Sequence, residues 1–264
     1  MTLERWRTVF ASVAGTSHAK TSTPCQDAGR CSIVTTTDGD EILVAAVADG
    51  AGTAYHSEVG AALAVERFIR DFGQAAQDDP TLARIDRAFA EGWIIDFCEA
   101  VGQLAVDEGH QARDYACTLL GAVVGCEAAI YVQIGDGAII VAGEEPGEYG
   151  WITWPQHGEY ANTTNFVIQD DACKVLFFDR GRAVSEIALF TDGIERLVLD
   201  HSAHVVHAPA FRPIFEWLAQ MPPGATEQPS EILAAYLGSD HVNRRTDDDK
   251  TLVMATRAKY IGSG

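Results

Sequence analysis

Apolar residues recur along this chain in two periods, one typical of strands and one typical of helices. Short apolar runs predict early strands at residues 6–14, 30–36 and 42–48, and the last of these is almost unbroken. Six similar runs follow after Gly109: ACTLLGAVVG, AAIYVQIG, AIIVAG, KVLFFD, EIALFT and TLVMATRA. The pattern therefore predicts two groups of short β-strands, separated by a stretch of different periodicity.

That intervening stretch predicts two long helices. Ser57 can cap a helix that continues through EVGAALAVERFIRDF, and Asp79 followed by Pro80 predicts the start of a longer one through residue 109. A loop-rich insertion is expected at 143–172, and shorter helices are expected at 194–200, 208–220 and 228–237. Strands, helices, strands, then helices and a last strand predict an α+β layered fold, with residues 1–264 as one domain.

Composition narrows the classes of partner. The 264 residues include 38 Asp and Glu against 19 Lys and Arg, a net charge of -19. Such a charge argues against nucleic acid or an anionic membrane as a partner, because both attract clustered cations. The first ten residues carry charges where a signal peptide needs an apolar run, and nothing approaches the ~20 apolar residues of a membrane span. We therefore expect a soluble cytoplasmic protein.

The six cysteines show no CxxC pair and no regular spacing, and several lie in apolar runs. Their positions are 25, 31, 98, 117, 126 and 173. The pattern favours reduced thiols over disulfides or a zinc site.

Three apolar strands run directly into an Asp-Gly pair. LVAAVADG ends at Asp49, IYVQIGDG at Asp136, and EIALFTDG at Asp192. One Asp-Gly pair alone is typical of a tight turn. Three at strand ends favour a second interpretation, in which rigid strand termini hold carboxylates in fixed positions and each glycine lets an ion approach the backbone.

Further acids stand near both ends of the chain. Asp247, Asp248 and Asp249 precede the last strand, and Asp27 follows Gln26 ahead of an early one. Taken alone, the first group is typical of a solvated acidic loop and Asp27 of a turn. Oxygen ligands without His or Cys select Mg²⁺ or Mn²⁺, and two such ions about 4 Å apart activate a bridging water and clamp a phosphoryl group.

Taken in order, these segments resemble a known family. QD, VADGAG, CTLLGAVV, IGDG, FTDGI and DDKTLV resemble the PP2C family of serine/threonine phosphatases, most of all its compact bacterial stand-alone members. The resemblance extends from Gly15 to Met254. It implies a four-layer α-β-β-α fold in which a central antiparallel β-sandwich is flanked by helices, with two metal ions at one end.

The resemblance also implies roles for individual residues. Asp49 matches the acid that bridges both ions, and Gly50 matches the glycine whose carbonyl binds one of them. Asp192 and Asp248 match the other direct ligands, and Asp27 matches an acid that reaches a metal through water. The implied catalytic set is Asp27, Asp49 and Asp192, while Asp136 matches a ligand of a third, weaker metal. HGEYANTTNF corresponds to a flap beside the site.

Three departures from the family pattern concern the handling of substrate. Many members carry an Arg before the QD motif that binds the substrate phosphate, but GTSHAKTSTPCQD contains none. His18 and Lys20 are the candidate replacements, with a surface loop position as the alternative. Gly137 and Ala138 replace two polar residues of the usual GDSR, and Gln26 replaces an acid found in some relatives.

The function implied is hydrolysis of phosphoserine and phosphothreonine on proteins, with Mg²⁺ or Mn²⁺ as cofactor. The implied partners are phosphoproteins and a serine/threonine kinase that supplies them, and we expect a monomer. The missing Arg leaves two alternatives open. One is a regulatory binding module of the same fold with weak or no turnover, and the other is a phosphatase of small metabolites using the same centre.

Two segments rich in His or Trp do not favour a ligand site. His201, His204 and His207 recur at a spacing of three, which would spread them around a helix and suits a single metal ion poorly. Trp151 and Trp154 are expected to pack the insertion, since few cations accompany them.

Overall fold

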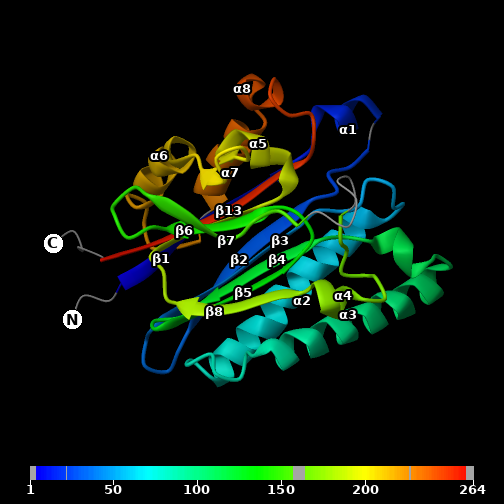
Figure 1. The fold of residues 1–264 in the computed structure, drawn as a ribbon, viewed down its shortest axis with the longest axis horizontal. Helices are drawn as coiled ribbons and strands as arrows, with labels where there is room; N and C mark the ends of the chain where they lie inside the picture. Colours follow the sequence, from blue (N-terminus) through cyan, green and yellow to red (C-terminus); the bar gives the residue numbers. More distant parts are fainter. Residues whose placement is uncertain (1–3, 22, 157–163, 226, 260–264) are drawn as a thin grey trace.

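Two β-sheets, antiparallel except for the short parallel pair β1–β12, stack face to face, with helices on both outer faces (Figure 1). The computed structural model describes residues 4–21, 23–156, 164–225 and 227–259. In these ranges the first sheet has the order β2–β3–β4–β5–β8, with bounds Ala28–Thr35, Glu41–Ala48, Leu119–Val124, Ala128–Ile134 and Phe177–Arg182. The second has the order β12–β1–β13–β9–β6–β7, with bounds Gly224–Ala225, Glu4–Val13, Lys250–Lys259, Glu186–Phe190, Ala138–Ala142 and Tyr149–Thr153.

Helices from different parts of the chain cover the two faces. The long helices α2 (Ser57–Asp78) and α3 (Arg87–Glu108) lie on the side of the first sheet (Figure 1). The other side carries α5 (Glu195–Val198), α6 (Ala208–Leu218), α7 (Glu227–Leu237) and α8 (Asp240–Asn243). Short elements complete the fold: α1 (Thr16–Thr21), η1 (Ala112–Tyr115), α4 (Ala172–Val175) and η2 (Asp192–Ile194). The expected four-layer α-β-β-α architecture is confirmed.

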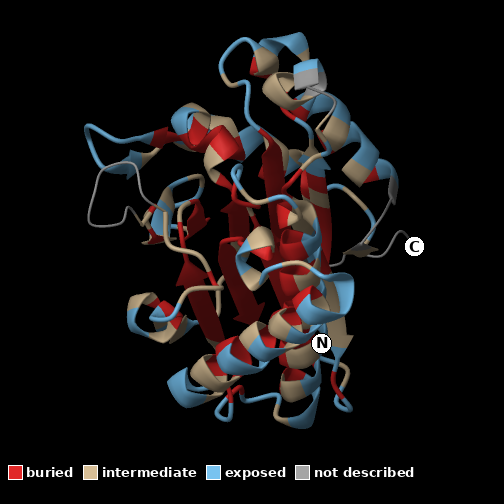
Figure 2. Cartoon of the chain, turned by 90° about the vertical axis from the view of Figure 1, so that its right-hand side faces the viewer, coloured by how far each residue is buried: buried red, intermediate tan, exposed pale blue. Residues whose placement is uncertain are grey.

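Strand β3 shows why an unbroken apolar run fits this position. All eight of its residues are buried, because one face meets the helices and the other meets the second sheet. Val44 and Ala46 join the cluster that contains Phe68 of α2, whereas Leu43 and Val47 join the cluster between the sheets. Figure 2 shows the resulting concentration of buried residues in the strands. Because alternate residues of β3 pack into these two clusters, the end of the strand, where Asp49 follows, is held in place.

The second long helix begins later than the sequence predicted. Residues 79–86 form turns, because the Asp79 carboxylate accepts hydrogen bonds from the backbone N–H groups of Thr81 (3.2 Å) and Arg84 (2.9 Å). The helix starts at Arg87, after Asp86 accepts from the Phe89 N–H at 2.8 Å. Asp79 stabilises a turn here and does not cap a helix, so that boundary was wrong.

Other segments of the second half of the chain also differ from the expectation. Residues 174 and 175 belong to α4, so strand β8 begins at Phe177. The helix predicted at 194–200 ends at Val198, and Leu199–Asp200 pairs with Val205–Val206 as the ribbon β10–β11. The insertion contains strand β7, and residues 157–163 of the expected flap lie outside the described residues.

Over the ranges that are described, no helix is long and apolar enough to cross a membrane.

The two tryptophans of the insertion contact two histidines from a later segment of the chain. His204 stacks on Trp154 with ring centroids 4.0 Å apart, and His201 meets the same indole edge-on at 5.6 Å. Trp151 contacts Trp154 at 5.6 Å. These histidines pack the insertion together with the tryptophans. His204 lies in a turn with a positive φ of 58°, which excludes the regular helix on which the His spacing was judged.

Candidate metal centre

Asp49 is held at the end of β3 by its backbone. Its N–H donates to Thr118 Oγ1 at 2.9 Å, and its carbonyl accepts from the Thr118 N–H at 2.8 Å. The next residue, Gly50, forms an isolated bridge with Cys117. A Cβ on Gly50 would lie 2.7 Å from the Gln26 carbonyl oxygen, so this position requires glycine. The carboxylate therefore starts from a fixed backbone position.

A threonine connects the two sheets beside this carboxylate. Asp27 precedes β2 of the first sheet, and its Oδ2 accepts a hydrogen bond of 2.7 Å from Thr191 Oγ1, which follows β9 of the second sheet. The same hydroxyl accepts from the Thr251 N–H at 3.1 Å. The Asp27 and Asp49 carboxyl groups are themselves within hydrogen-bonding reach of each other. Asp192 comes next after Thr191, so the link brings three acids from two sheets together.

The acidic segment before β13 packs against the turn that carries Asp192. A Cβ on Gly193 would overlap the Asp249 carbonyl oxygen and would lie 3.6 Å from the Asp248 Cβ. Only a glycine lets the two backbones approach so closely. Asp192 and Asp248 are therefore neighbours, as the sequence interpretation required.

Asp248 and Asp249 have different surroundings. Asp249 is buried, and its carboxylate accepts from the N–H groups of Gly15 and Gln26, both at 2.6 Å. It also lies 2.9 Å from His18 Nδ1. Asp248 is exposed, and its Oδ1 accepts only from the following N–H at 2.9 Å among the bonds described. Asp249 thus ties two loops to β13, which leaves Asp248 as the acid available to an ion.

Asp136 lies in the turn between β5 and β6. Its Oδ2 accepts from Thr164 Oγ1 at 2.8 Å. The adjacent Gly137 N–H donates to Glu195 Oε1 at 2.8 Å, and Glu195 is buried. The local sequence marks Glu195 only by its place three residues after Asp192, in a segment that the pattern predicts as an ordinary helix.

Burial and mutual repulsion raise the pKa values of these carboxyl groups. Burial raises the pKa of Asp49 well above its usual range, and the charges of Asp27 and Asp192 raise it further. Burial, followed by the charges of Asp136 and Asp248, raises the pKa of Asp192 to about 8. Burial likewise raises the pKa of Asp27 to about 6, against the hydrogen bond from Thr191. A cation placed among these groups would relieve the repulsion.

The donor set suits a hard divalent ion that keeps some of its water. In the described ranges no three His, Cys, Asp or Glu side chains form a complete ligand set around one point. Mg²⁺ usually retains several waters and takes one or two carboxylates, so neighbouring carboxylates fit it without such a set.

The buried Lys250 ammonium donates to Asn243 Oδ1 and the Asp248 carbonyl oxygen, both at 3.1 Å, and thereby fixes the backbone at Asp248.

The two candidate phosphate-binding residues lie on the short helix α1. His18 lies beside Asp249, at the edge of the cluster. Lys20 is exposed on the same helix, and no hydrogen bond or ion pair of its side chain is found among the described residues. The structure therefore gives His18 a partner within the fold and places Lys20 toward solvent.

Comparison with known proteins identifies sequence relatives. Residues 14–238 match the family model described as protein phosphatase 2C. Serine/threonine-protein phosphatase 3 from Escherichia coli (strain K12) is 37% identical over 257 residues, which cover 96% of this chain and 99% of that relative.

Solved structures share the fold at lower identity. Serine/threonine phosphatase Stp1 from Staphylococcus aureus is 16% identical with a TM-score of 0.62, and the match covers 97% of each chain. The catalytic domain of the phosphatase PstP, solved in complex with two manganese ions, is 17% identical with a TM-score of 0.62. That match covers 97% of this chain and 99% of the other.

Proposed function

The chain belongs to the protein phosphatase 2C family, the metal-dependent serine/threonine phosphatases, and we propose that its carboxylate cluster is a binuclear Mg²⁺ or Mn²⁺ centre. The observation that carries the proposal is the meeting of Asp27, Asp49, Asp192 and Asp248 from both sheets. Their pKa values are raised by burial and by one another, as expected of anions collected for a cation.

Each residue of the centre has its own role. Asp49, the Gly50 carbonyl, Asp192 and Asp248 would hold the two ions, and Asp136 would contribute to a third. When bound, the ions supply an activated water and neutralise the charge on the phosphoryl oxygens. The Thr191 hydroxyl holds Asp27 Oδ2, so the Asp27 carboxylate stays oriented toward the cluster while it positions water.

The number of ions follows by analogy with PstP, which was solved with two manganese ions. Hydrolysis of phosphoserine and phosphothreonine on proteins, with a serine/threonine kinase as the partner that supplies them, follows from the family. The net charge of -19 would repel a phosphorylated substrate, so bound divalent ions would provide the attraction. We propose a single domain that acts as a monomer.

A substrate panel tests this function. Purified protein with Mn²⁺ is expected to release phosphate from phosphoserine and phosphothreonine peptides, and excess EDTA is expected to abolish release. Release from nucleotides or sugar phosphates alone would indicate a metabolite phosphatase. Metal binding with no release from any substrate would indicate a regulatory binding module. Either outcome would contradict the proposed protein phosphatase.

The raised pKa values predict how metal stabilisation depends on pH. An acid whose folded pKa exceeds its unfolded value binds protons more tightly when folded, so the metal-free protein loses stability as pH rises toward 8. Mn²⁺ relieves that repulsion at pH 8 but must displace protons at pH 6. We expect the Mn²⁺-induced rise in Tm to be larger at pH 8 than at pH 6, measured by differential scanning fluorimetry. An equal or larger rise at pH 6 would contradict the metal assignment.

A further inference from the structure

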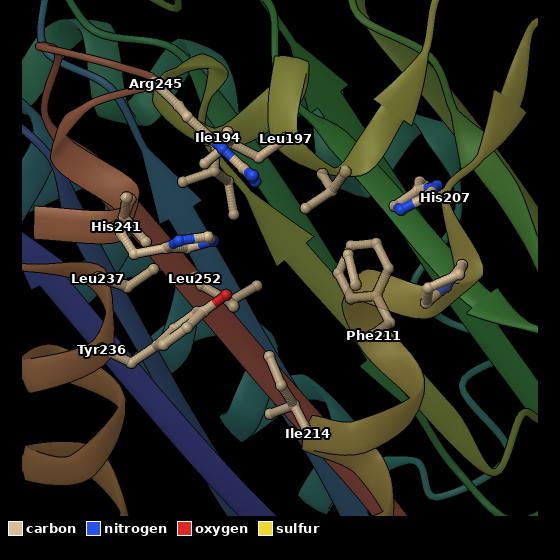
Figure 3. Close-up of a pocket in the computed structure, with 14 residues that line it drawn as sticks. Ile194, Leu197, His207, Phe211, Ile214, Tyr236, Leu237, His241, Arg245 and Leu252 are labelled. Atoms are coloured by element: carbon tan, nitrogen blue, oxygen red, sulfur yellow. The ribbon is translucent and has the colours of Figure 1, made fainter. Parts of the chain in front are cut away.

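A hollow outside the metal centre lies on the helical face of the second sheet. Residues of η2, α5, α6, α7, α8 and β13 surround a cavity of about 220 Å³ (Figure 3). Its apolar wall includes Ile194, Leu197, Phe211, Ile214, Leu237 and Leu252. The proposed metal chemistry uses none of these side chains.

The polar groups of the hollow are basic. Arg245, His241 and His207 line it, and Tyr236 adds a hydroxyl group. Figure 3 shows the Arg245 and His241 side chains directed toward the cavity. Within the described residues, the side chains of Arg245, His241 and His207 form no hydrogen bond or ion pair.

The charge of the hollow is opposite to that of the protein. None of the 14 lining residues is Asp or Glu, although the chain carries 38 acids and a net charge of -19. Arg245 keeps its charge at any physiological pH, and each imidazole can donate a hydrogen bond in either protonation state. The unpaired donors therefore suit an anionic group and disfavour a cation.

A second, more apolar hollow adjoins the first. Ile214 and Tyr236 also line a neighbouring cavity of about 240 Å³, together with Trp217, Ile232 and others. Ile232 and Tyr236 are 50% and 49% exposed, large values for such side chains. The two hollows adjoin at Ile214 and Tyr236, and we call them together the groove; the first contributes the basic side chains and the second is apolar.

We propose that this groove binds a small amphipathic anion. A carboxylate or phosphate headgroup would accept hydrogen bonds from Arg245 and His241, and a hydrocarbon tail would cross Ile214 toward Trp217. A purely polar anion would leave the apolar end empty, and a neutral apolar molecule would leave the donors unpaired. An amphipathic anion matches both ends of the groove.

The groove shares structural elements with the metal centre. Ile194 comes two residues after Asp192 in η2, and Leu252 lies in β13, which directly follows Asp249. An occupant would contact η2, which carries the proposed ligand Asp192, and β13, which begins two residues after the proposed ligand Asp248. By reciprocal linkage, bound Mn²⁺ would then change the affinity of the groove for its ligand.

Isothermal titration with decanoate, below its micelle concentration, tests the binding site. We expect saturable binding by the full chain and at least a roughly tenfold loss of affinity in Arg245→Gln, because a charge-assisted hydrogen bond is removed. The matched control is Arg244→Gln, since the exposed Arg244 donates to the Asp240 carbonyl oxygen and does not line the hollow. Ala210→Trp, which fills the cavity, is expected to abolish binding.

Three outcomes would overturn the proposal: no decanoate binding, equal loss in Arg244→Gln and Arg245→Gln, or equal binding of decyltrimethylammonium. Flotation with anionic phospholipid vesicles separates the two sources of such a headgroup. Arg245-dependent flotation would identify a membrane lipid as the source, and decanoate binding without flotation would identify a free amphiphile. Repeating the titration with Mn²⁺ tests the linkage, and an unchanged affinity would refute it.

Discussion

Replacing Asp49 with Asn is expected to lower kcat/KM toward a phosphopeptide by on the order of a thousandfold. Burial, followed by the charges of Asp27 and Asp192, raises the pKa of Asp49, and its backbone is fixed on both sides by Thr118. An amide in its place could not supply the negative charge that the two proposed cations would require, so the activity lost would be the share that these ions provide.

The same variant is expected to gain stability without metal. Since burial and neighbouring charges raise the pKa of Asp49, removing its charge relieves repulsion at pH 8 and should raise the Tm of the EDTA-treated protein. Asp107→Asn is the matched control, because Asp107 lies exposed on α3 and its carboxylate accepts from Gln103 and from no other side chain in the described ranges. Unchanged turnover in Asp49→Asn, with Asp107→Asn also normal, would remove Asp49 from the mechanism.

Substitutions of the adjacent Asp248 and Asp249, just before β13, are expected to affect different properties: turnover for Asp248 and stability for Asp249. Asp248→Asn should lower kcat/KM about a hundredfold with little change in stability, because Asp248 is exposed and is proposed to ligate a metal. Asp249→Ala should cost about 3 kcal/mol of unfolding free energy, because it leaves the buried N–H groups of Gly15 and Gln26 without an acceptor. Urea denaturation and phosphopeptide kinetics measure the two effects.

Asp247→Asn provides the control for this pair. Asp247 is exposed, and its backbone oxygen, which the substitution retains, accepts the bonds from Ser17. Neither stability nor turnover should change. If Asp249→Asn abolished metal binding while Asp248→Asn left it intact, the ligand would be Asp249, and the assignment made from the motif would be wrong by one residue.

The architecture was predictable because its layers impose different periods on the sequence. The unbroken apolar run 42–48 in β3 reflects burial of both faces of that strand, and the helical spacing of apolar residues in α2 reflects burial of one face. Both patterns are visible in the sequence. The start of α3 was not predictable in this way. Asp79 and Asp86 are both suitable caps, and the choice depends on the turn that Asp79 stabilises with Thr81 and Arg84.

The candidate site was predictable only in part. Strand-end Asp-Gly pairs located Asp49, Asp136 and Asp192, since a strand terminus fixes a carboxylate locally. The separate tasks of Asp248 and Asp249 depend on Gly15 and Gln26, more than 220 residues away in the sequence. The hydrogen bonds of Glu195 and Lys250 likewise depend on how the segments pack in the fold, and no local sequence pattern predicts them.

The most direct test of the central claim is anomalous X-ray diffraction from Mn²⁺-soaked crystals, collected at the manganese absorption edge. The account predicts two strong peaks that share Asp49, with Asp192 and Asp248 in direct contact with one of the ions and the Gly50 carbonyl in contact with an ion. A peak elsewhere on the protein, or none beside Asp49 at saturating Mn²⁺, would contradict it.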